Sequence, residues 1–152
     1  MAFHFSLDAV LHLRKSIEHQ QELKLRSANQ NVARVRHAIE QLDGRRQHLL
    51  AAQSRQLADG TTAAEMRFEL HCEAQLLRHR REREQQLATL EQARNQQRQI
   101  LREARQARET LEAVRERQLS LYQKERLRRE QRNLDDLFLM RLLGKQGRLR
   151  QG

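Results

Sequence analysis

The sequence predicts an all-α fold, in which two long helices of unequal length pack as an antiparallel coiled-coil hairpin. Three observations predict it. The chain of 152 residues contains no Pro and is rich in Arg, Gln, Leu, Glu and Ala, all good helix formers. Only 38% of its residues are hydrophobic, which is too few for a thick core but enough for the two apolar positions in seven that a coiled coil requires. One break near Gly60 separates two long helical segments.

We expect helix one to cover about residues 7–58. Ser6 is a good N-cap, Phe5 and Val10 have the spacing of a hydrophobic staple, and Asp8 suits the positive end of the helix dipole. Apolar residues then recur at alternating steps of three and four, with Arg46 as the one interruption. This seam consists of Leu25, Ala28, Val32, Val35, Ile39, Leu42, Arg46 and Leu49.

Residues 59–62 have the features of a tight connection between antiparallel helices. Gly60 can adopt the left-handed conformation that ends a helix. Thr62 and Glu65 have the spacing of a capping box, in which each side chain accepts a hydrogen bond from the other residue's backbone N–H. A short connection makes the two helices neighbours.

We expect helix two to run from about residue 63 to about residue 143, where Gly144 and Gly147 should end it and leave residues 144–152 as a flexible tail. The whole chain, residues 1–152, is then a single hairpin. The apolar seam of helix two is weaker, and it consists of Met66, Leu70, Leu77, Leu87, Leu90, Leu101, Ala104, Leu111, Val114 and Leu121.

The end of helix two should project beyond helix one, because folding the chain at Gly60 places Leu7 opposite roughly residues 106–119. Residues 115–152 hold eleven Lys or Arg against five Asp or Glu, in a chain whose net charge is +10. Residues 134–143 are mainly apolar. An uncovered apolar patch beside positive charge is typical of a partner-binding surface.

The basic run at residues 124–132 has three interpretations. It is a solvated helix face with intrahelical ion pairs, such as Glu125 with Arg128 and Arg129, or a protein-docking face, or a nucleic-acid site. Nucleic acid is the least favoured, because acidic residues interrupt the run and Tyr122 is the one aromatic residue close by.

The sequence contains no arrangement typical of an enzyme, so we expect no catalytic residues, no cofactor, no metal and no small-molecule substrate. His71, Cys72 and His79 are the nearest approach to a ligand cluster, but the two histidines lie about two helical turns apart. A single cysteine fits a reducing, cytoplasmic compartment. The longest strongly apolar stretch, residues 137–143, is too short to span a bilayer, so we expect no direct membrane insertion.

Both ends of the chain resemble the flagellar export protein FliJ family. Residues 3–18 begin with the pattern Phe-x-Phe-x-Leu-acid and continue through an apolar pair to Arg14 and Glu18. Residues 130–137 are similar to the basic-to-acidic stretch near the C-terminus of that family. The chain length, the unequal helices and the break near Gly60 also match.

The resemblance implies a component of the flagellar type III export apparatus, located in the cytoplasm and peripherally associated with the inner membrane. Its implied partners are a hexameric export ATPase, the membrane protein of the export gate, and export chaperones. The residues implied for the ATPase ring are Phe5, Leu7, Leu11, Arg14, Tyr122, Arg126, Arg128, Arg129, Arg132, Leu134, Leu137 and Phe138. Those implied for the gate are Phe68, Cys72 and Leu76. Relatives can carry an aromatic residue near Cys72. This chain has none at that point, but Phe68 lies one turn earlier.

Two alternatives to the export role remain at the level of the sequence. The heptads are also typical of a general coiled-coil scaffold or dimeric tether, with the seams of helix one paired between chains. The sequence pI of about 11.2 leaves nucleic-acid binding as the other alternative.

Overall fold

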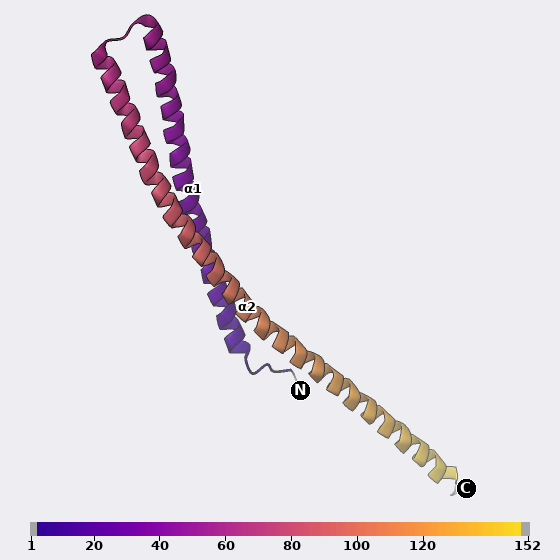
Figure 1. The fold of residues 1–152 in the computed structure, drawn as a ribbon. Helices are drawn as coiled ribbons and strands as arrows, with labels where there is room; N and C mark the ends of the chain where they lie inside the picture. Colours follow the sequence, from indigo (N-terminus) through magenta and orange to yellow (C-terminus); the bar gives the residue numbers. More distant parts are fainter. Residues whose placement is uncertain (1–2, 150–152) are drawn as a thin grey trace. The chain divides into compact units, whose positions relative to one another are not determined.

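The computed structural model describes residues 3–149, and side-chain environments among them up to residue 143. Two helices account for most of this part of the chain: α1 (Asp8–Asp59) and α2 (Ala63–Leu149), joined by a short connection (Figure 1). No strand occurs in residues 3–149, which confirms the predicted all-α class. The chain divides into two compact units. One contains residues up to Lys15 with those from Gln106 onward, and the other contains Ser16–Arg105.

The connection between the helices has the geometry that the sequence predicts. Gly60 has a φ of 95°, a conformation that L side chains rarely adopt. Glu65 accepts a hydrogen bond of 2.8 Å from the Thr62 backbone N–H and donates one of 3.3 Å from its own N–H to the Thr62 hydroxyl. These contacts form a complete capping box. The pKa of Glu65 is lowered mainly by the hydrogen bond that its carboxylate accepts from the Thr62 backbone N–H. A hydrogen bond with the Thr62 side chain lowers this pKa further.

The start of α1 lies one residue later than the predicted cap. The Leu7 carbonyl accepts the hydrogen bond of the Leu11 N–H at 2.9 Å, so Leu7 occupies the cap position. The Asp8 N–H donates to the Phe5 carbonyl at 3.2 Å, which satisfies one of the free donors of the first turn. Ser6 makes no side-chain hydrogen bond within residues 3–143, so its assignment as the N-cap was wrong.

The end of α2 also differs from the prediction. The helix continues through Gly144 and Gly147 to Leu149, so six residues assigned to the flexible tail (144–149) are helical. Glycine costs only about 1 kcal/mol in a helix, and no proline is present to remove a backbone donor. Residues 150–152 of the predicted tail lie outside the described residues.

In the unit formed by Ser16–Arg105, α1 and α2 pack side by side and run antiparallel. Val32, Val35 and Leu101 are buried there, and the other predicted seam residues of α1 are half-buried. The predicted seam of α2 is wrong near the connection. Met66 and Leu70 are 42% and 57% exposed, and the ion pairs with α1 begin farther along α2, at Glu73.

Three of the ion pairs that cross between the helices of this unit lie toward the connection. The Arg46 Nη2 lies 3.0 Å from a carboxylate oxygen of Glu73, Arg80 Nε lies 2.6 Å from Asp43, and Arg36 Nη2 lies 2.5 Å from Glu91. Arg46, which interrupts the apolar seam of α1, is therefore paired with an acid of α2. The residue numbers along α2 fall as those along α1 rise, which is the order of an antiparallel pair.

Candidate functional site

The segment of α2 at residues 123–143 is exposed at every position, and it forms the candidate docking surface. It belongs to the unit that contains residues up to Lys15. In that unit the N-terminal segment extends along α2 as far as Tyr122, whose ring centroid lies 5.7 Å from that of Phe3. Beyond Tyr122 the apolar side chains lie open to solvent, with Leu127 65%, Leu134 66% and Phe138 64% exposed.

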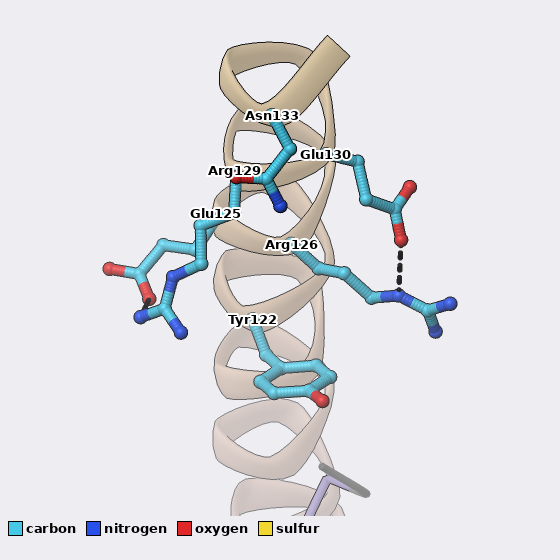
Figure 2. A pocket seen from close by; sticks show the side chains of 6 residues that line it. All are labelled: Tyr122, Glu125, Arg126, Arg129, Glu130 and Asn133. Atoms are coloured by element: carbon cyan, nitrogen blue, oxygen red, sulfur yellow. Dashed lines mark hydrogen bonds and ion pairs between the residues drawn. The ribbon is translucent and has the colours of Figure 1, made fainter. Parts of the chain in front are cut away.

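A shallow groove begins at Tyr122 on this segment. Figure 2 shows the six side chains that line it. Two arginines of the groove form intrahelical ion pairs: Arg126 Nε lies 2.8 Å from Glu130, and Arg129 Nη2 lies 3.6 Å from Glu125. The Glu130 carboxylate, by its hydrogen bond and charge, and then Tyr122 raise the pKa of Arg126. Asn133 completes the lining.

Arg128 and Arg132 differ from the two groove arginines, because they form no ion pair with any side chain of residues 3–143. Of the two predicted partners of Glu125, therefore, the structure pairs only Arg129. Arg128 and Arg132 lie one turn apart, so this part of α2 has two cations available to an acidic partner. The interleaved acids neutralise the other two arginines, which is unfavourable for a continuous polyanion site.

The N-terminal residues assigned to the ATPase ring have two different environments. Phe5 and Leu11 are 4% and 3% exposed, so they are buried within their own unit and are not accessible to a partner. Leu7 and Arg14 lie at the surface. The structure therefore brings this segment and Tyr122 together but makes only part of the predicted set accessible. Arg126, Arg128, Arg129, Arg132, Leu134, Leu137 and Phe138 are all exposed.

The residues assigned to the export gate divide in a similar way. Phe68 is 68% exposed, whereas Cys72 and Leu76 are half-buried. Sequence reasoning missed two further apolar residues in this region, since it placed Met66 and Leu70 in the seam. The sequence carries no signal for this difference, because Met66 and Leu70 have the same helical spacing as the half-buried Leu77 that follows them.

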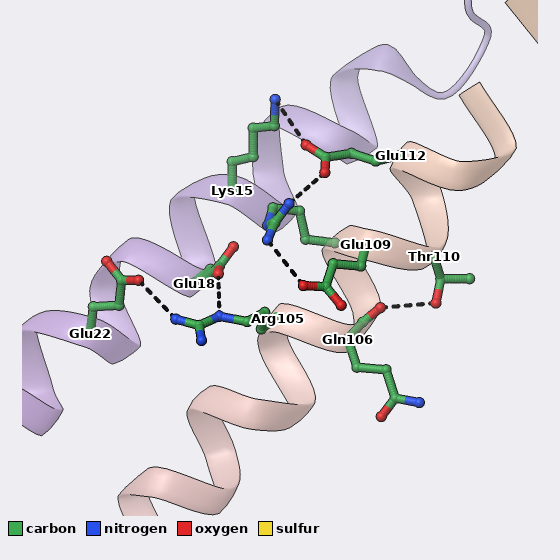
Figure 3. Close-up of polar contacts among 9 residues, drawn as sticks. Lys15, Glu18, Glu22, Arg105, Gln106, Glu109, Thr110 and Glu112 are labelled. Atoms are coloured by element: carbon green, nitrogen blue, oxygen red, sulfur yellow. Dashed lines mark hydrogen bonds and ion pairs between the residues drawn. The ribbon is translucent and has the colours of Figure 1, made fainter. Parts of the chain in front are cut away.

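Polar clusters connect the two helices within each unit where the apolar seam is interrupted (Figure 3). In the Ser16–Arg105 unit, Arg105 Nε lies 3.1 Å from Glu18, whose side chain is only 11% exposed, and Arg105 Nη2 lies 3.4 Å from Glu22. In the other unit, Lys15 Nζ lies 3.3 Å from Glu112, which also pairs with Arg108. These groups hold the helices in register.

These clusters contain no nucleophile–base pair, and among the described residues no three His, Cys, Asp or Glu side chains converge to hold a metal ion. No helix in the described part of the chain is long and apolar enough to cross a membrane.

The family model described as flagellar FliJ protein matches residues 3–147. The chain belongs to the FliJ family. No curated protein and no solved structure matches it. Membership of this family makes the chain a component of the flagellar export apparatus, and its family is one of structural, chaperone-like export components. Interaction within that apparatus is therefore its general role.

Proposed function

We propose that this FliJ-family chain is a coiled-coil stalk that binds the hexameric export ATPase and promotes ring assembly and ATP hydrolysis. The observation that carries the proposal is the exposed segment of α2 at residues 123–143, which combines free arginines with large apolar side chains. A helix with one such face inside a six-fold ring cannot contact all six subunits alike. It therefore favours one arrangement of open and closed sites by differential binding.

The proposal includes two further contacts in the export apparatus. The apolar residues near the connection, above all Phe68, are assigned to the membrane protein of the export gate. Export chaperones are the third class of partner. We place the chain in the cytoplasm, peripherally associated with the apparatus at the inner membrane.

Charge reversal at Arg128 and Arg132 tests the ATPase contact. These side chains are exposed and form no ion pair with the described side chains, so Arg128→Glu with Arg132→Glu removes positive charge without breaking an internal contact. The assay is ATP hydrolysis and ring size of the export ATPase from the same organism, with and without an equimolar amount of each variant. We expect the double variant to lose most of the stimulation, while circular dichroism shows unchanged helicity.

The matched control is Arg98→Glu with Arg102→Glu. These residues are also exposed, lie on α2 at the same spacing and form no ion pair with the described side chains. We expect the control to stimulate hydrolysis as the original chain does. If both double variants lose the same activity, the effect is one of total charge, and the assignment of the ATPase contact to the end of α2 is wrong.

A further inference from the structure

The exposed segment of α2 carries a regular heptad stripe that no part of the described chain covers. Leu127, Glu130, Leu134, Leu137 and Arg141 follow one another at alternating steps of three and four, which places them along one side of the helix. The three leucines are 65%, 66% and 55% exposed. One acid and one base are thus the only charged positions of a stripe that is otherwise apolar.

The stripe is complementary to itself when two copies lie antiparallel. An alignment that places Leu134 opposite Leu137 of a second copy also places Glu130 opposite Arg141 of that copy. Both matches share one register because both pairs are symmetric about the same point, between Asp135 and Asp136. In a two-fold interface each contact occurs twice, so the alignment contains two leucine contacts and two ion pairs.

We propose that this stripe binds a second copy of the chain in this antiparallel register. Charge complementarity distinguishes this occupant from others. Arg141 has no ion pair with any side chain of residues 3–143, and the pairing supplies one. Glu130 is bound to Arg126 at 2.8 Å, but both side chains are more than half exposed, and such a pair contributes little.

A parallel pair is disfavoured by the same residues. In a parallel coiled coil, Glu130 would face Glu130 and Arg141 would face Arg141, and like charges at facing positions oppose association. Between Glu130 and Arg141, the side chains that flank the stripe in the antiparallel arrangement are uncharged: Gln131, Asn133, Phe138 and Met140. No like-charge contact within this span therefore offsets the two ion pairs.

The size of the stripe predicts a weak and reversible dimer. Residues 127–143 extend for about 25 Å along the helix. Two helices in contact over this length bury less than the roughly 1,200–2,000 Å² of stable complexes. The dimer therefore forms when no stronger ligand covers the stripe, and it requires no export ATPase. Its success or failure is thus independent of the proposed function.

Sedimentation equilibrium of the purified full chain tests the register by charge exchange. Glu130→Arg and Arg141→Glu should each raise the dimer Kd roughly tenfold, because each replaces two attractive contacts with two repulsive ones. The double variant exchanges the charges and should restore the original Kd to within about twofold. Glu125→Arg, on the opposite side of the helix, is the matched control and should leave the Kd unchanged.

Three results would overturn the proposal. The first is a monomer at every concentration up to the millimolar range. The second is a double variant no tighter than the single variants, which would exclude this register. The third is unchanged dimerisation of Leu134→Glu, which would place self-association elsewhere. All of the substituted positions are exposed, and circular dichroism checks that each variant remains helical.

Discussion

Replacing Leu11 with Ala should release the start of α1 from its unit, whereas the same change at Leu13 should not. Leu11 is 3% exposed and, with Phe5, provides the buried apolar surface of the N-terminal segment, while Leu13 is 58% exposed. Leu→Ala removes about three methylene equivalents at about 0.8 kcal/mol each, so Leu11→Ala should cost about 2–3 kcal/mol. At Leu13 the cost should stay below about 1 kcal/mol, since over half of that side chain is already in water.

Hydrogen exchange is the suitable assay because the N-terminal segment can open without global unfolding. The amides of residues 8–15 in Leu11→Ala should exchange roughly 30- to 150-fold faster, the factor that corresponds to 2–3 kcal/mol. Amides around Val32, in the other unit, are the internal control and should be unaffected. Equal exchange in Leu11→Ala and Leu13→Ala would refute the argument that burial of Leu11 stabilises this segment.

Four other changes test the connection and the proposed gate contact. Thr62→Ala should cost about 1 kcal/mol by loss of the N-cap, measured by thermal unfolding. The lowered pKa of Glu65 implies stability that is present above the unfolded value near 4.3 and lost as pH falls through the lower folded value. Glu65→Gln should therefore flatten this part of the pH–stability profile, and an unchanged profile would contradict the assignment. Gly60→Ala should destabilise the chain by about 1–2 kcal/mol through its φ of 95° alone, because an added Cβ meets nothing within 4 Å; an unchanged Tm would argue against that strain. Phe68→Ala should weaken binding to the cytosolic part of the export gate without loss of helicity, and Ile100→Ala, also exposed on α2, should bind normally; equal binding by both would remove Phe68 from the contact.

The sequence was sufficient to predict the connection and the seam of α1, because their determinants are local. A left-handed glycine and a capping box each require particular residues at fixed spacing, and Gly60, Thr62 and Glu65 supply them. The apolar residues of α1 recur with little interruption, so the buried Val32 and Val35 could be identified from their period alone.

The seam of α2 could not be predicted in the same way, because much of it is polar. A periodicity of apolar residues omits Glu73, Arg80 and Glu91, which reach across to α1. The same omission placed the exposed Leu70 in the seam. Recognising the polar contacts requires the two helices to be aligned first, and only then do opposite charges coincide.

The predicted boundaries of the two helices were also wrong, because they relied on local residue preferences alone. The carbonyl that accepts the first backbone bond of α1 belongs to Leu7, although Ser6 has the better capping side chain. At the other end, Gly144 and Gly147 are weak helix formers, but the residues between and around them continue the backbone hydrogen bonds to Leu149. Local preference is a small term in each case, and the neighbouring backbone bonds outweigh it.

Polar contacts in the unit that contains residues up to Lys15 and those from Gln106 onward determine which part of α2 is available to partners. Exposed ion pairs add little stability, but their correct partners exist in only one register. Lys15 pairs with Glu112 in the register that also brings Phe3 to Tyr122. A slip of one heptad would place Phe3 beside Arg129, cover the groove and separate Lys15 from its acid. The weak ion pair thus acts chiefly by specificity, since it sets the last covered residue at Tyr122 and leaves the arginines and leucines that follow free for docking.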